Sequence, residues 1–247
     1  MKQQTNRWFF PLLSLGLGLL AGGCRFMLYA AGLDGKGLIL AHHPAAIALW
    51  ILTGLACAAA AAGGILWRGE NRAADGQNCP VLQAAGDLFM AGGICSTLLI
   101  PEEGGIPILM ILHRYAAYAA VAALIAGAVY RLLGKPVPFF CPALASVFLL
   151  IHALARYRVW SSDPQPVDYL FALGASLCLC LFAYYETALS VRLEGRRQRL
   201  ITGILGIFFT VATSARGEYE LLHLGGALWM ILTLLTGQSG EKAEDAG

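Results

Sequence analysis

Eight stretches of mostly apolar residues divide this chain, and they constrain its fold more than any other feature. A helix needs about 20 mainly apolar residues to cross a lipid bilayer. Charged residues make up 13% of the chain, compared with about 25% in soluble domains. We therefore predict an all-α fold, a polytopic bundle of eight transmembrane helices in a lipid bilayer. The predicted helices cover residues 8–31, 44–67, 82–100, 106–130, 137–155, 168–189, 200–215 and 219–236.

The distribution of lysine and arginine predicts how this bundle is oriented. If all eight stretches cross and the N-terminus is cytoplasmic, eleven basic residues between the stretches lie inside and four lie outside. Such an excess is typical of cytoplasmic loops, and it disappears when the third stretch, interrupted by Gln83 and Asp87, is left out. We predict cytoplasmic termini, a single transmembrane domain over 1–237 and a disordered polar tail over 238–247. The four outer basic residues are Lys36, Arg156, Arg158 and Arg216.

Composition also excludes some kinds of function. The net charge is +2, and no segment combines dense lysine and arginine with interleaved aromatic residues, so we expect no nucleic-acid partner. The seven cysteines show no spacing that is typical of zinc ligands. We predict no cofactor from these patterns.

All five histidines fall in the predicted outer half of the bundle, together with several charged residues. On a helix, residues three or four apart share a face, which pairs His152 with Arg156 and Glu220 with His223. We therefore predict an outer-facing polar vestibule and a non-enzymatic function, the binding, sensing or permeation of a small polar or anionic solute. The candidate ligand-binding residues are His113, Arg114, His152, Arg156, Arg158, Glu220 and His223.

The same histidines leave an enzyme open as an alternative. His113, His152 and His223, with Glu220 or Asp168, are ligand types that suit zinc. Such a centre would make the protein a metal-dependent, membrane-embedded hydrolase. A single outer haem held by two imidazoles is a further alternative. A di-iron centre is excluded, because it needs two Glu-x-x-His motifs and the chain offers one.

The charged residues inside the predicted spans include Asp87, Arg114 and Glu186. Ionisable groups there are costly and normally face a partner or a cavity. Arg114 lies about 12 Å from the outer end of its span, at 1.5 Å per residue. We expect either that a carboxylate and this arginine pair across the bundle, or that Asp87 binds a proton or cation during transport. We expect Glu186 at the cytoplasmic interface.

Small residues spaced three or four apart predict where helices pack closely. These faces also suit a homo-oligomer or a membrane partner, so a structural subunit of a membrane complex is a further alternative. The small residues are Gly18 and Gly22, then Gly54, Ala58 and Ala62, then Gly203 and Gly206.

The segment LLAGGC, which ends at Cys24, is similar to a lipoprotein cleavage site. Small residues occupy the three positions before Cys24, whereas a lipoprotein signal normally has an aliphatic residue three positions before the cysteine. Beyond Arg25 the chain stays apolar, which completes a length that can span a bilayer. We interpret the segment as part of the first helix rather than a removed leader, with Arg25 near its outer end and able to snorkel.

Two segments on the predicted outer side carry a further signal: GLDGKGLILAHHP before the second stretch and ARYRVWSSDPQPVDYLF before the sixth. They resemble a group of small multi-pass membrane proteins from clostridial Gram-positive bacteria. The resemblance implies a protein of the bacterial plasma membrane and carries over no catalytic residue. Independently, His43 and Pro44 suit the cap and first turn of a helix. The matching positions are Asp34, Lys36, His43, Pro44, Arg156, Arg158, Trp160, Asp163 and Pro164.

Overall fold

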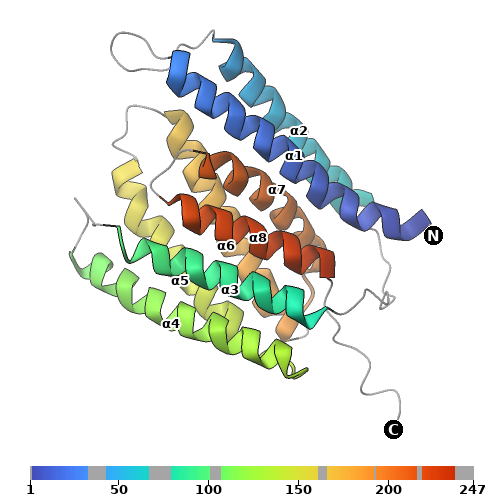
Figure 1. Ribbon diagram of the computed structural model, residues 1–247, viewed down its shortest axis with the longest axis vertical. Coiled ribbons are helices and arrows are strands. Elements are labelled where there is room, and N and C mark those ends of the chain that lie inside the picture. The colour runs from blue at the N-terminus through green and yellow to red at the C-terminus, as the bar shows by residue number, and fades with distance from the viewer. Residues whose placement is uncertain are drawn as a thin grey trace.

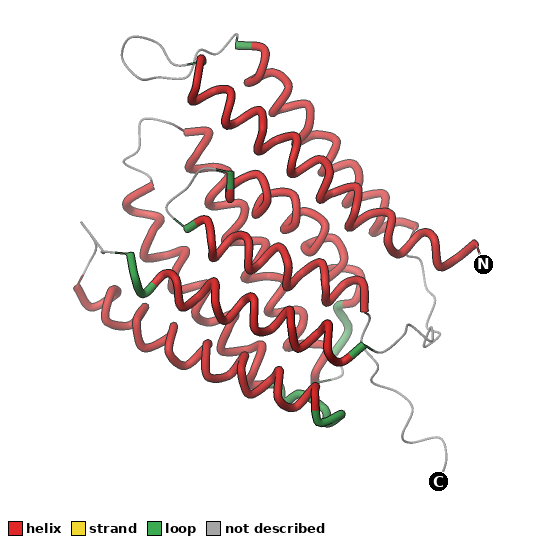
Figure 2. Tube along the Cα trace, in the orientation of Figure 1, coloured by secondary structure: helices red, strands yellow, loops and turns green. Residues whose placement is uncertain are grey.

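A computed structural model describes residues 2–32, 43–66, 79–100, 107–160, 166–191, 193–215 and 219–236 of the chain. Within these ranges the chain forms eight α-helices and no strand, which confirms the all-α prediction (Figures 1 and 2). Each helix covers most of one predicted stretch, and the predicted tail at 238–247 lies outside the described residues. The helices are α1 (Lys2–Ala31), α2 (Pro44–Leu66), α3 (Pro80–Thr97), α4 (Pro107–Leu132), α5 (Phe140–Trp160), α6 (Pro166–Ser190), α7 (Arg196–Ser214) and α8 (Glu220–Thr236).

Five of these helices are long and apolar enough to cross a membrane, so the chain is a multi-pass membrane protein. Helix α8 is apolar but has only 17 residues. Helix α3, which contains Gln83 and Asp87, and helix α7, which begins with a group of arginines, are not among these five. The five segments are Trp8–Ala31, Pro44–Leu66, Pro107–Leu132, Phe140–Tyr157 and Tyr169–Ser190.

Proline begins four of the helices, α2, α3, α4 and α6. The first helical position suits proline, because the N–H that it lacks would have no partner within the helix. At α2 the imidazole of His43 accepts a hydrogen bond from the backbone of Ala45, with 3.3 Å between Nδ1 and N. The His43 carbonyl also accepts from Ala46 and Ile47. This confirms the predicted cap at His43 and Pro44.

Helices α3 to α8 form a closed ring, in which each helix packs on the next and α8 returns to α3. Helices α1 and α2 lie outside this ring and both pack on α7 (Figure 1). Consecutive helices run in opposite directions, so α1 begins and α8 ends at the same end of the bundle. We call this the inner end, because the charge distribution predicts that it faces the cytoplasm, and we call the opposite end the outer end.

A core of fully buried apolar side chains fills the ring. Aromatic contacts connect its members; for example, the rings of Phe182 and Trp229 meet edge to face, with 5.2 Å between centroids. The largest buried members are Met90 and Ile94 on α3, Phe148 on α5, Leu179 and Phe182 on α6, and Trp229 on α8.

Small residues allow several of the helices to approach closely. Gly18 and Gly22 of α1 face α7 and its C-cap, since a Cβ atom would lie 3.0 Å from Val211 at Gly18 and 3.1 Å from Ala215 at Gly22. Gly206 of α7 lies equally close to Met230 of α8. These contacts confirm the predictions for the first and seventh spans, and they occupy those faces within the chain.

The predicted small-residue face of α2 is wrong. A Cβ atom on Gly54 would have no neighbour within 4 Å, and Ala58 is exposed. The helix instead packs through Gly63 and Gly64, close to isoleucine side chains of α7. A spacing of four identified a stripe of small residues, but it did not identify which side of an almost uniformly apolar helix faces the protein.

Helices α3 and α8 meet backbone to backbone at two glycines. A Cβ atom on Gly93 would lie 2.9 Å from the carbonyl oxygen of Leu221, and one on Gly225 would lie 2.5 Å from that of Phe89. Both neighbours are backbone atoms, which cannot move aside as a side chain can. The two glycines therefore set the distance between α3 and α8.

The expectation that Arg25 snorkels is wrong. Its side chain is buried and holds the outer half of α1 against α7. Its side chain is 2% exposed and donates from Nη1 to the carbonyl of Ala212, at 2.7 Å. Ala212 lies in the last turn of α7, where carbonyl groups lack partners within the helix. Cys24 lies beside Arg25 inside the uninterrupted helix α1, as the interpretation of this segment predicts.

Candidate functional site

Two histidines from neighbouring helices meet in the outer half of the ring. His113 of α4 and His152 of α5 are 1% and 0% exposed, and 3.1 Å separates Nε2 of the first from Nδ1 of the second. One ring therefore donates to the other. The ring of Phe148, a member of the core, lies tilted beside both histidine rings.

An arginine and a tyrosine complete this side of the cluster. Arg156 lies one turn from His152 on α5, and its guanidinium lies over the ring of Tyr219, 4.5 Å from the centroid. The same tyrosine ring meets His152 edge to face at 4.8 Å. Tyr219 directly precedes α8, so the cluster joins α4, α5 and α8.

His223 extends the cluster one turn deeper along α8, on the same face as Tyr219. Its side chain is 1% exposed, and neither ring nitrogen has a hydrogen-bond partner among the described residues. The hydroxyl of Tyr219 is also buried and without such a partner. Buried polar groups nearly always have a partner, so these atoms mark a place where a ligand or water is expected. We call His113, His152, Arg156, Tyr219 and His223 the outer cluster.

The remaining predicted ligand-binding residues do not join the outer cluster. Arg114 lies on the exposed face of α4, and Glu220 lies on the exposed face of α8. Helix geometry explains both placements. Arg114 directly follows the buried His113, and Glu220 directly follows the buried Tyr219, so each points about 100° away from its buried neighbour. The side chains of Arg158 and Asp168 lie outside the described residues, as does His42.

Within the described part of the chain, the histidines form no metal site with carboxylates or cysteines. Across the described ranges, no three histidine, cysteine, aspartate or glutamate side chains lie where they could hold a metal ion together. The facing nitrogens of His113 and His152 are engaged with each other. The alternative of a metal-dependent hydrolase therefore gains no support from the arrangement of these residues.

A second polar group surrounds Asp87 near the inner end. Asp87 is 3% exposed, and Oδ2 accepts a hydrogen bond from Nε of Arg131 at 2.7 Å. Arg131 also donates from Nη1 to the amide oxygen of Gln83 at 2.7 Å, and Trp229 donates from Nε1 to Oδ1 of Asp87 at 3.0 Å. Asp87 thus pairs with Arg131 in the last turn of α4 and not with Arg114.

Glu186 of α6 belongs to the same region. It lies near the end of α6 at the expected inner end of the bundle, but it is 3% exposed, so it is packed among helices there. Its Oε1 accepts a hydrogen bond from Nη1 of Arg199 at 2.7 Å. The first turn of α7 brings Arg199 against the last turns of α6 and covers the carboxylate.

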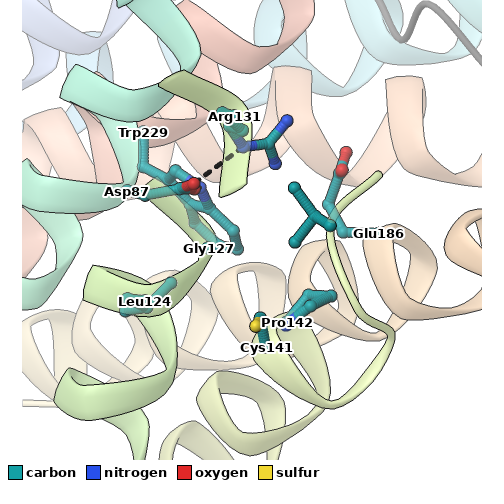
Figure 3. Close-up of a pocket in the computed structure, with 9 residues that line it drawn as sticks. Asp87, Leu124, Gly127, Arg131, Cys141, Pro142, Glu186 and Trp229 are labelled. Carbon is teal, nitrogen blue, oxygen red and sulfur yellow. Dashed lines mark hydrogen bonds and ion pairs between the residues drawn. The ribbon is translucent and has the colours of Figure 1, made fainter. Parts of the chain in front are cut away.

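A small cavity lies between these two ion pairs (Figure 3). Its volume is about 10 Å³ for the centre of a water molecule, which is room for roughly one water. In Figure 3 the guanidinium of Arg131 is drawn between the carboxylates of Asp87 and Glu186. The cavity is lined by Asp87, Leu124, Gly127, Arg131, Val137, Cys141, Pro142, Glu186 and Trp229. We call Gln83, Asp87, Arg131, Glu186, Arg199 and Trp229 the inner cluster.

The two clusters approach each other along α8. His223 of the outer cluster and Trp229 of the inner cluster are six residues apart, which is about 9 Å of helix rise. The α3 residues above Asp87 at helical spacing are Met90 and Ile94, both fully buried and apolar. Only a thin apolar layer therefore separates the clusters.

The sequence identifies the histidines and Asp87 but not several of their partners. Arg131 falls in a loop by its sequence, because the apolar stretch ends one residue before it. Tyr219 and Trp229 are of types common at membrane interfaces and in cores, so no local pattern separates them from packing residues. Asp87 does indicate that a partner exists, because a buried carboxylate requires a hydrogen-bond donor nearby.

No protein-family profile, curated protein or solved structure matches the chain.

Proposed function

We propose that the protein binds a small anionic or polar solute at the outer cluster, as a receptor or permease of the membrane. The observation that carries this proposal is the unpartnered, fully buried pair of His223 and Tyr219. Both offer hydrogen-bond donors, and the guanidinium of Arg156 lies against the tyrosine ring. A ligand with acceptor atoms and negative charge suits such a set better than a cation does.

The membrane arrangement that goes with this function has eight spans with both termini in the cytoplasm. Supporting it are the excess of basic residues on one side and the antiparallel order of the helices. Helices α3, α7 and α8 cross as members of the ring, where their polar residues face other helices instead of lipid. The resemblance carried by the two outer segments supports the plasma membrane of a bacterium as the location.

The test is solute-dependent stabilisation of the purified protein in detergent. The midpoint of thermal unfolding is measured with inorganic anions, small carboxylates and, as neutral controls, the corresponding amides. A solute that binds only the folded state at 100 times its Kd stabilises it by about 2.7 kcal/mol. We expect a saturable rise in the midpoint with at least one anion class and none with the amides.

The variant Tyr219→Phe makes this test specific. It keeps the ring that contacts Arg156 and His152 and removes only a hydroxyl that has no partner among the described residues. We expect unchanged stability without solute and a loss of the response to solute. Arg114→Ala, next to His113 but on the exposed face, is the matched control and keeps the response. An equal response in Tyr219→Phe and the wild type would contradict the proposal.

A further inference from the structure

We propose that Asp87 is a proton-binding site, and that protonation of Asp87 moves the ion pair of Arg131 from Asp87 to Glu186. The inference concerns the inner cluster and does not depend on solute binding at the outer cluster. It assigns to the cavity in Figure 3 a defined ligand, one proton delivered through one water molecule.

The first support is the arrangement of charges around the cavity. Two carboxylates from different helices, Asp87 of α3 and Glu186 of α6, line one space with Arg131 of α4. Arg131 bonds to Asp87, while Glu186 is held by Arg199. A carboxylate has about four acceptor sites, so Glu186 retains capacity for a second guanidinium. Arg131 thus has two carboxylates beside it in one cavity and forms its ion pair with Asp87.

The second support is access from the inner end. The Arg131 and Arg199 side chains are 15% and 12% exposed, whereas those of their carboxylate partners are both 4% exposed. The arginines therefore lie between the buried acids and the inner surface. Val137, in the short connection after α4, and Pro142, in the first turn of α5, form the cavity wall on that side. Because Arg131 both lines the cavity and is partly exposed, one side chain separates a water molecule in the cavity from the inner surface.

Protonation of Asp87 conserves atoms and charge. A hydronium ion in the cavity gives its proton to Oδ2 of Asp87 and becomes water, and the carboxylate becomes a neutral acid. The Nε–H group of Arg131 loses a charged acceptor and turns to the carboxylate of Glu186. Trp229 continues to donate to Oδ1 of Asp87, and the new O–H donates to the cavity water. Both oxygens of Asp87 therefore keep a partner in the two states, because Oδ1 keeps Trp229 and Oδ2 exchanges Arg131 for the cavity water.

Each helix around Asp87 contributes a polar or charged group that faces this region. The four charged members of the inner cluster are two acids and two arginines, so the region is neutral before protonation and carries one positive charge after it. The partly exposed arginines hold that charge near water, where it is least costly. The facing groups are Gln83 on α3, Arg131 on α4, Cys141 on α5, Glu186 on α6, Arg199 through Glu186 on α7 and Trp229 on α8.

The test is infrared difference spectroscopy of the protein in lipid nanodiscs, without solute, as the pH is lowered from about 9 to about 4, a range that spans ordinary and raised carboxyl titration. We expect a carbonyl band of a protonated, buried acid to grow on acidification. The band is lost in Asp87→Asn and kept in Glu186→Gln, where it needs more acid to appear because Arg131 has no second carboxylate. A wild type without such a band, or a band that persists in Asp87→Asn, overturns the proposal.

A second variant keeps the proposal testable if Asp87→Asn does not fold. A Cβ atom on Gly127 would lie 3.5 Å from both Oδ2 of Asp87 and Cβ of Cys141, which is ordinary contact. Gly127→Ala therefore fills water-sized space and leaves every charge in place. We expect the band to form more slowly after a pH jump, because the delivering water is displaced. Formation at the wild-type rate contradicts delivery through the cavity.

Discussion

The contact between α3 and α8 gives the sharpest prediction, because two adjacent glycines of α3 have opposite surroundings. A Cβ atom on Gly93 would meet the backbone of α8, 2.9 Å from the Leu221 carbonyl oxygen and 3.0 Å from Cα of Leu222. A Cβ atom on Gly92 would have no neighbour within 4 Å. The variants Gly93→Ala and Gly92→Ala therefore add the same methyl group to the same helix, one against backbone and one in open space.

The free energies of unfolding of the two variants share one contribution, the effect of alanine on the helix, and differ in a second, the contact with α8. Replacing glycine with alanine inside a helix stabilises it by about 0.5–1 kcal/mol, so Gly92→Ala should stabilise the protein by roughly that amount. Gly93→Ala has the same gain, but overpacking a close contact costs about 1–3 kcal/mol. The helix contribution cancels in the difference, so Gly93→Ala should be less stable than Gly92→Ala by about 1–3 kcal/mol.

The measurement is the free energy of unfolding in mixed micelles, titrated with a denaturing detergent and followed by circular dichroism. Both variants are compared with the wild type at one lipid-to-protein ratio. A Gly93→Ala protein as stable as Gly92→Ala would refute the reasoning. It would mean that α3 and α8 are not held at the observed distance by their glycines.

Two further predictions concern the inner cluster, both measured by the same titration. Trp229→Phe keeps an aromatic ring against Phe182 but removes the only indole donor to Asp87 found in the described residues, and should cost about 1–3 kcal/mol. Arg199→Met leaves Glu186 buried without its observed ion pair and should cost about 3–5 kcal/mol, whereas Arg197→Met, on the exposed side of the same turn, should change stability by less than about 0.5 kcal/mol. Equal effects of the two arginine variants would contradict the role given to Arg199.

The fold was largely predictable because the bilayer imposes long apolar segments that are visible in one sequence. Proline and a histidine cap marked the beginning of α2, and the spacing of Gly18 and Gly22 marked the face of α1 that meets α7. The face of α2 was not predictable. Its residues are apolar on every side, because both lipid and the protein interior accept apolar residues. No polar face therefore shows which side of α2 packs on the protein.

The candidate site was predictable by residue type but not by orientation. His113 and Arg114 are adjacent and both polar, yet only the histidine lies inside the ring. Asp87 and Arg131 form a partly buried ion pair across 44 residues of sequence. Such a contact depends on the order of helices around the ring, which local spacing does not contain. The contacts between side chains of α3 to α8 therefore follow from the packing of the bundle and not from local sequence.

The short distance between the clusters has an electrical consequence. The hydrocarbon layer of a bilayer is about 30 Å thick, but the apolar layer between His223 and Trp229 spans about 9 Å of helix rise. A unit charge that moves from one cluster to the other crosses about a third of that thickness. In a uniform field it gains about a third of the 2.3 kcal/mol or so per 100 mV that a full crossing supplies. Voltage is therefore a source of work on any charge that passes between the two clusters.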